Sequence, residues 1–122
     1  MKRIVIDGND GVGKSTLVRA LLKLGYDVSD RGIPTTMTIH PDVKPRDDEL
    51  YIILDAPVET SRERLAQAGK DLTEQFHTVE DLTHYRQRFL DVAKVLPNCH
   101  VIDATQTAEK VLEECLSTIG KH

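Results

Sequence analysis

The chain has 122 residues, the size of a single domain with one hydrophobic core. Hydrophobic residues make up 39% of it and charged residues 30%, which is ordinary for a soluble globular protein. The net charge of −4 argues against nucleic acid as a ligand, because such proteins need a basic field to contact many phosphates. A small nucleotide stays compatible with this charge.

Cysteine spacing and hydropathy predict the cellular compartment of the protein. Cys99 and Cys115 form neither a Cys-x-x-Cys pair nor a metal-binding spacing, and Cys115 is interpreted as a buried thiol. No segment approaches the roughly 20 apolar residues of a membrane span, and the first basic residues lead into a short strand. We therefore expect a cytoplasmic protein without a membrane partner.

The first predicted elements are a strand, a glycine-rich loop and a helix. The strand covers residues 3–7, and its continuous apolar run is typical of a buried parallel strand. The helix is predicted over Lys14–Leu24. Between them, the spacing Gly8-x4-Gly13-Lys14-Ser15 matches the phosphate-binding pattern of P-loop proteins, in the strand-to-helix context that its mechanism requires.

This loop predicts a site for the phosphates of ATP with Mg²⁺. Its glycines let consecutive N–H groups turn toward an anion, and the helix adds the positive end of its dipole. Lys14 would place its charge on the β- and γ-phosphates, and the Ser15 hydroxyl would ligate the metal. The predicted nucleotide-binding residues of the loop are Asn9, Asp10, Gly11, Val12, Gly13, Lys14, Ser15 and Thr16.

Strands and helices alternate through the rest of the chain. Further strands are predicted at 26–30, 50–54 and 100–103, and further helices at 57–68, 78–96 and 107–119. This alternation predicts an α/β fold with three layers, of the P-loop NTPase type, forming one domain over residues 1–122. We expect a parallel sheet of about four strands in the order 2-1-3-4, with helices on both faces and ligands at the carboxyl ends of the strands.

Several charged residues fall at those strand ends or in the loop. Asp30 can hold Mg²⁺ through water and Arg31 can bind a phosphate with two hydrogen bonds, although a turn aspartate beside a solvated arginine fits equally well. Asp55 precedes Ala-Pro and is interpreted as a helix N-cap. Asp10 occupies a position that the phosphate pattern leaves free. It either accepts a hydrogen bond from another ligand or is a tolerated loop residue.

The stretch Ile6–Thr16 resembles the opening of thymidylate kinases, and Asp30-Arg31 looks like the Asp-Arg pair of that family. The segments Leu54–Pro57 and Glu63-Arg64 are similar to the strand and helix that precede its lid. With the closing segment of the chain, the resemblance covers about two-thirds of the sequence, in the right order.

The resemblance implies roles for particular residues. Asp10 would contact the sugar hydroxyl of a deoxynucleotide acceptor, Arg31 would hold its phosphate, and Asp30 would lie near Mg²⁺. Thr35 is a further candidate for substrate binding. Arg64 would join Lys14 and Arg31 as a catalytic residue, because phosphoryl transfer needs positive charge around the transferred group. The residues implied to border the adenine are Asp103, Ala104 and Thr105.

Three functions stay open at this point. The first is transfer of the γ-phosphoryl group of ATP to a deoxynucleoside monophosphate. The second is transfer to a nucleoside, a polynucleotide end or a modified base, although the net charge argues against a nucleic acid partner. The third, suggested by a short acceptor region, is an ATP-binding protein without transfer activity that acts through a partner. A homodimer in which a neighbouring subunit completes the site also remains open.

Overall fold

The computed structural model describes residues 2–30, 33 and 46–122. Within these residues the chain forms four strands and four helices. They are β1 (Arg3–Gly8), α1 (Lys14–Lys23), β2 (Val28–Ser29), β3 (Glu49–Asp55), α2 (Val58–Gln67), α3 (Val79–Val95), β4 (Cys99–Asp103) and α4 (Ala108–Gly120).

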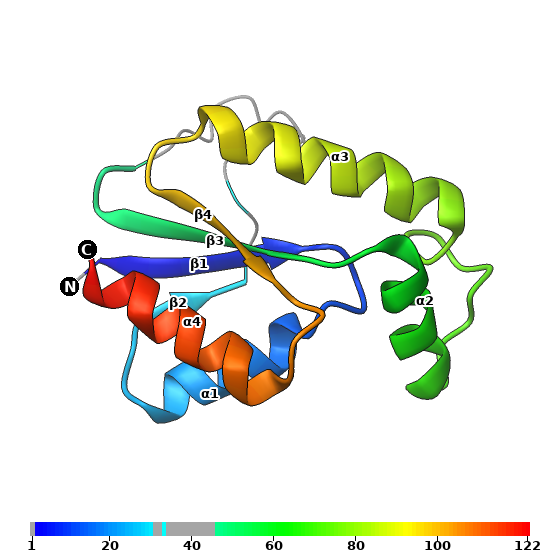
Figure 1. Cartoon of the computed structure of the whole chain (residues 1–122), viewed down its shortest axis with the longest axis horizontal. Helices are drawn as coiled ribbons and strands as arrows, with labels where there is room; N and C mark the ends of the chain where they lie inside the picture. Colours follow the sequence, from blue (N-terminus) through cyan, green and yellow to red (C-terminus); the bar gives the residue numbers. More distant parts are fainter. Residues whose placement is uncertain (1, 31–32, 34–45) are drawn as a thin grey trace.

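All the paired strands run parallel, in the order β2-β1-β3-β4 (Figure 1). This confirms the predicted α/β fold and its strand order. Gly8 at the end of β1 lies opposite Leu54, and Asp55 lies opposite Asp103 of β4. The register therefore brings the carboxyl ends of β1, β3 and β4 to one edge of the sheet, beside the glycine-rich loop.

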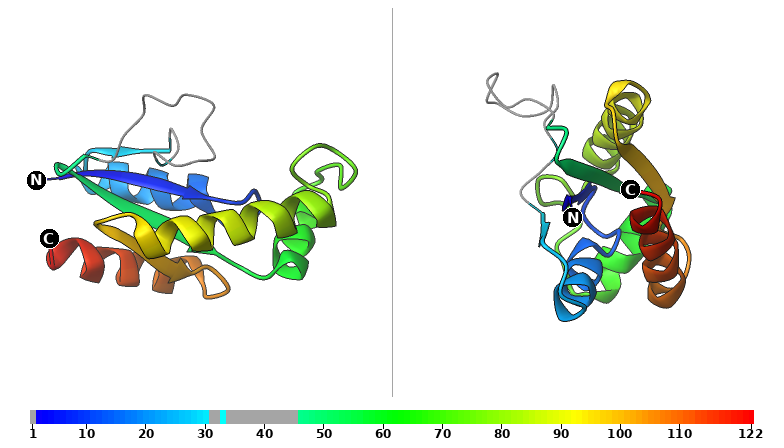
Figure 2. Two further views of the ribbon diagram at one scale, coloured as in Figure 1. Left: turned by 90° about the horizontal axis from the view of Figure 1, so that it is seen from above. Right: turned by 90° about the vertical axis from the view of Figure 1, so that its left-hand side faces the viewer.

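Helices cover both faces of the sheet, which explains why its central strands are apolar without alternation. On one face, Ile4, Ile52 and Ile102 belong to a buried cluster to which α1 and α4 contribute. On the other face, Val5 and Tyr51 pack with residues of α3. Figure 2 shows the resulting three layers end-on, and α2 lies beyond the edge of the sheet where β3 ends (Figure 1).

The second strand and the start of the second helix differ from the predictions. The second strand was predicted over 26–30, but β2 is limited to Val28–Ser29, because only these residues pair with β1. The interpretation of Asp55 as the N-cap of the next helix is wrong. Pro57 is the N-cap of α2, and no side chain of the described residues caps this helix. Among the described residues, no helix is long and apolar enough to cross a membrane.

Candidate functional site

The phosphate loop (Gly8–Thr16) has the backbone that its sequence predicts. Gly11 adopts a φ of 82°, in the left-handed region that favours glycine. A Cβ at this position would lie only 2.6 Å from the backbone oxygen of Ser61 in α2. The loop therefore packs directly against α2, and only glycine allows this approach.

The first turn of α1 is left open to an anion. Its N-cap is Gly13, no acidic residue lies in the first turn, and none of the described side chains caps the helix. By contrast, α3 and α4 are capped by the hydroxyls of Thr78 and Thr107, and both have acidic residues in the first turn. Uncapped N–H groups with the positive end of the helix dipole make an anion site at the start of α1.

Lys14 lies across this loop. Its Nζ donates a hydrogen bond of 2.6 Å to the backbone oxygen of Gly8 and stands 3.9 Å from Oδ1 of Asp10. The ammonium group is thus held over the turn where the phosphates of a nucleotide would lie. Its predicted role in phosphate binding fits this position.

A cavity of about 460 Å³ opens beside the loop, between α1 and α4. Its volume lies within the range of small-ligand pockets. Gly13 and Thr16 of the loop line it, together with Arg64 of α2. The other lining residues are Val12, Leu17, Ala20, Ala104, Gln106, Thr107, Ala108, Glu109, Val111 and Leu112.

Two of the predicted base-binding residues, Ala104 and Thr105, have different environments. Ala104 is buried, lines this cavity, and donates its N–H to the backbone oxygen of Asp55 at 2.7 Å. Thr105 does not line the cavity, and its N–H and hydroxyl both donate to Oδ1 of Asp103, at 2.9 and 2.7 Å. Gln106, the next residue, does line it. This glutamine could not be singled out from a sequence pattern.

The predicted metal and acceptor residues are only partly described. Ser15 is exposed in the first turn of α1, as a ligand of Mg²⁺ beside the phosphates requires, and Asp30 is exposed just after β2. Arg31 and Thr35 lie outside the described residues. In the described part of the chain, no three acidic, histidine or cysteine side chains gather into a metal site.

Asp55 has a partner that the sequence did not reveal. Arg86 of α3 binds both its carboxylate oxygens, at 2.9 and 3.1 Å. The side-chain hydrogen bond to Asp55 raises the pKa of Arg86. This ion pair ties α3 to the carboxyl end of β3, so the carboxylate serves the fold at the edge of the site.

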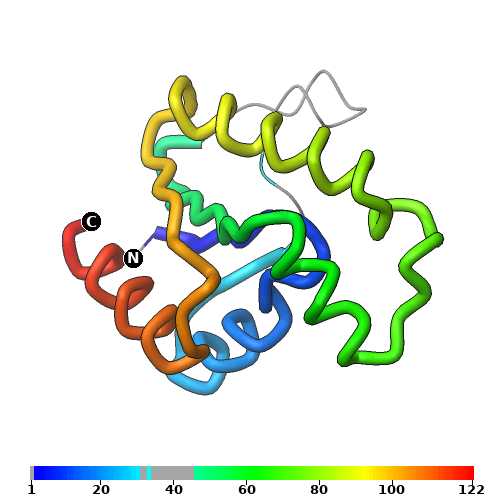
Figure 3. The backbone as a smooth tube through the Cα atoms, turned by 45° about the vertical axis from the view of Figure 1, so that its right-hand side comes forward, coloured from blue at the N-terminus to red at the C-terminus, as the bar shows by residue number. Residues whose placement is uncertain are grey.

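His77 is the main residue of the site that sequence reasoning missed. It lies in the connecting loop (residues 68–78), which leaves the end of α2 and returns to α3 (Figure 3). Its Nε2 lies 3.0 Å from Oδ2 of Asp10, and its Nδ1 lies 3.0 Å from the backbone oxygen of Asp71. Asp10 thus accepts a hydrogen bond from within the chain. The connecting loop has no periodicity or motif that would have predicted this contact.

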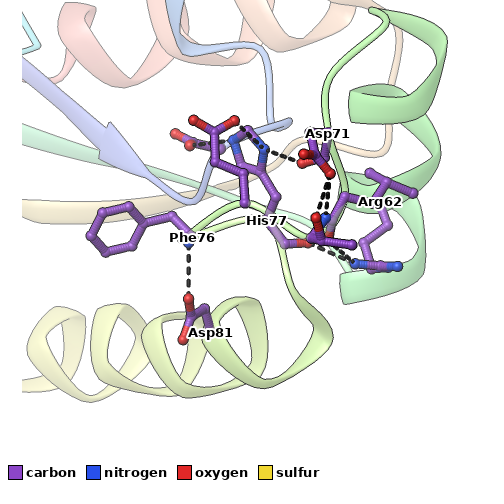
Figure 4. Close-up of polar contacts among 9 residues, drawn as sticks. Arg62, Asp71, Phe76, His77 and Asp81 are labelled. Atoms are coloured by element: carbon purple, nitrogen blue, oxygen red, sulfur yellow. Dashed lines mark hydrogen bonds and ion pairs between the residues drawn. The ribbon is translucent and has the colours of Figure 1, made fainter.

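Arg62 of α2 holds the same loop. Its Nη1 donates hydrogen bonds to the backbone oxygens of Leu72 and His77, at 3.1 and 2.7 Å. Figure 4 shows Arg62 and Asp71 on the side of His77 toward α2, and the N–H of Phe76 bound to Asp81 of α3. The loop is therefore anchored to both flanking helices and presents His77 to the phosphate loop.

The fold, the open start of α1 and the adjoining cavity define a P-loop nucleotide-binding domain. Comparison with known families agrees and is more specific, because the model of the 50S ribosome-binding GTPase family matches residues 3–121. The chain belongs to this family.

One relative is similar to this chain over most of the chain's length. It is the bifunctional cordycepin biosynthesis cluster protein 3 of Cordyceps militaris. It is 29% identical over 143 aligned positions, which include 95% of this chain. The chain spans only 16% of that protein, so the likeness concerns one part of it.

The resemblance to thymidylate kinases is therefore corrected. The match to a GTPase family over residues 3–121 overturns it. The residues on which the resemblance rested give the physical reason. Gly8–Thr16 contains what any P-loop protein needs to hold a phosphate, so this stretch indicates the class without separating kinases from GTPases.

Proposed function

We propose that the chain is a Mg²⁺-dependent nucleoside triphosphatase that takes GTP, where the sequence had suggested ATP. The phosphates would occupy the phosphate loop, and the base would occupy the cavity between α1 and α4. One observation carries this proposal. Gly13 and Thr16 belong to the loop and also line the cavity, so a single ligand can fill both.

The preference for guanine rests on Glu109 and on the family. Glu109, in the first turn of α4, is the acidic side chain among the described residues that line the cavity. A carboxylate accepts hydrogen bonds from the adjacent N1–H and N2–H groups of guanine, whereas adenine offers an acceptor at N1. Glu109 thus favours GTP over ATP by its chemistry.

The chain supplies mainly position and charge to the reaction. The N–H groups of the phosphate loop and the ammonium of Lys14 would hold the β- and γ-phosphates as negative charge shifts between them. Arg64, at the cavity wall, is proposed as a further positive charge near the phosphates. Ser15 and Asp30 are the proposed ligands of Mg²⁺, which when bound neutralises phosphate charge.

Transfer of the γ-phosphoryl group to a nucleoside monophosphate, rather than to water, is a second candidate. A second cavity of about 550 Å³ between α2 and α3 favours it, because Arg62 and Arg86 line this cavity together with Glu59. Each guanidinium has five N–H donors, so N–H groups remain beyond those that bind the connecting loop and Asp55. Guanidinium groups suit the phosphate of an acceptor. Under both candidates the proposed partners are small nucleotides.

One assay separates these functions. The protein is incubated with Mg²⁺ and GTP or ATP, with or without each deoxynucleoside monophosphate, and inorganic phosphate and new nucleotides are measured. Phosphate release with a preference for GTP supports the first candidate, and phosphorylated acceptor supports the second. Binding without any turnover would leave a nucleotide-binding protein that acts through a partner.

The Glu109→Gln variant tests the base site. We expect it to lose most of its preference for GTP over ATP, by about tenfold, because a carboxylate that accepts two hydrogen bonds becomes an amide. Glu113→Gln is the matched control, since Glu113 lies one turn further along α4 and is exposed outside the cavity. Equal preference in the two variants would refute the placement of guanine.

A further inference from the structure

Three ionisable side chains, His77, Asp10 and Lys14, lie in sequence from the connecting loop to the phosphate loop. Oδ2 of Asp10 lies 3.0 Å from Nε2 of His77, and its other oxygen, Oδ1, lies 3.9 Å from Nζ of Lys14. Asp10 therefore stands between two groups that can be positive. The side chain of His77 is only 10% exposed, whereas that of Asp10 is 44% exposed. The histidine is the buried end of the line.

The surroundings of the imidazole favour a ring in which both nitrogens donate. Nδ1 faces the backbone oxygen of Asp71 at 3.0 Å, with Oε2 of Glu74 at 3.6 Å, and Nε2 faces the carboxylate of Asp10. All these atoms are acceptors, and only the protonated ring has two donors. Arg62 of α2 donates to the backbone oxygen of His77 and not to its ring.

The pKa of His77 agrees with this geometry. It is raised chiefly by the backbone oxygen of Asp71, against the opposing effect of burial, and further by Asp10 and Glu74. His77 is thus cationic to a higher pH than an ordinary histidine.

A carboxylate within a phosphate loop presents an electrostatic problem. A triphosphate brings several negative charges to the site, and the like charge of Asp10 opposes its binding. Without a second cation, Asp10 would also attract the ammonium group of Lys14 away from the β- and γ-phosphates, which this group has to reach. A positive group that neutralises the carboxylate removes both effects.

We propose that His77 is a positioning residue that neutralises Asp10, so that the phosphate loop accepts a triphosphate and Lys14 stays available to it. His77 acts through Asp10 and does not touch the nucleotide. The connecting loop serves to carry this charge, which explains why Arg62 holds it through the backbone of His77 itself. This inference rests on the proposed function, because it needs a nucleoside triphosphate in the phosphate loop.

The test is a binding titration with a fluorescent GTP analogue and Mg²⁺, between about pH 5.5 and 8.5, either side of the ordinary histidine pKa. The proteins are the wild type, His77→Gln, Asp10→Asn and the double variant. His84→Gln is the control for loss of a histidine, because His84 is exposed on α3 and its ring contacts Tyr85 instead. The nucleotide also takes up a proton in this range, but this contribution is common to all five proteins.

We expect wild-type affinity to fall as pH rises through the titration of His77. His77→Gln should bind about five- to tenfold more weakly at the acidic end and lose this pH step. Adding Asp10→Asn should restore the affinity, because the charge that needed neutralising is gone. The His84→Gln protein should behave as the wild type does.

Two results would overturn this inference but leave the proposed function standing. They are an unchanged pH step in His77→Gln, or a double variant that binds as weakly as His77→Gln. If His77→Gln does not fold, the Asp10→Asn variant provides the test. It keeps His77 but should still lose the fall in affinity with rising pH. NMR titration should then show a lower pKa for His77 in Asp10→Asn than in the wild type. A wild-type protein that binds no nucleotide at any pH would refute the proposed function first, and this inference with it.

Discussion

Replacing Gly11 by alanine tests how tightly the phosphate loop is packed against α2. Two effects add at this position. The φ of 82° is unfavourable for any residue with a Cβ, which costs about 1–2 kcal/mol. In addition, the new Cβ would lie 2.6 Å from the backbone oxygen of Ser61, far inside van der Waals contact, so that the loop and α2 must separate.

Gly13 offers a matched control in the same loop. Its φ is 90°, but a Cβ built there meets no described atom within 4 Å. Gly13→Ala should therefore show the backbone cost alone, about 1–2 kcal/mol. The destabilisation of Gly11→Ala should exceed that of Gly13→Ala by about 1–3 kcal/mol, the usual range for overpacking.

The measurement is the free energy of unfolding of both variants and the wild type, from denaturant titrations followed by circular dichroism. Equal destabilisation of Gly11→Ala and Gly13→Ala would refute the reasoning, because it would show that the contact with Ser61 contributes nothing. The result does not depend on which nucleotide binds. It therefore tests the architecture of the site separately from its chemistry.

Three further predictions concern the charged residues of the site. Lys14→Ala should weaken binding of the GTP analogue by about ten- to a hundredfold, the value of a charged hydrogen bond, with an unchanged circular dichroism spectrum; an unchanged affinity would remove Lys14 from the site. Asp55→Asn should lower the free energy of unfolding by about 1–3 kcal/mol, because it leaves Arg86 without its ionic partner in a half-buried position. For His77, the raised pKa in the folded state means that its stabilisation is complete below the unfolded pKa of about 6.5 and is lost as pH rises through the folded value. Unfolding titrations at several pH values should show this loss in the wild type and not in His77→Gln.

The GTPase assignment shows the limit of a motif. The pattern from Gly8 to Thr16 predicts a phosphate site because each of its residues has a local physical task, and the open start of α1 agrees with that prediction. The same tasks are common to kinases and GTPases, so the motif could not choose between them. In the proposed function the choice between guanine and adenine depends on Glu109, which lines the cavity and comes from the far end of the chain.

What the sequence by itself determined is the local and periodic part of the protein. Apolar runs placed β1 and β3, glycine spacing placed the phosphate loop, and Thr78 correctly marked the start of α3. These signals act between neighbours along the chain, where residue type alone decides the conformation.

Only the tertiary structure decided which distant residues share the site. His77 meets Asp10 across 67 positions, and Arg86 meets Asp55 across 31. Such contacts depend on how α2, the connecting loop and α3 pack at the edge of the sheet, and no repeating pattern encodes the path of that loop. The residues that tune the charge of the phosphate loop were therefore visible only once the chain was folded.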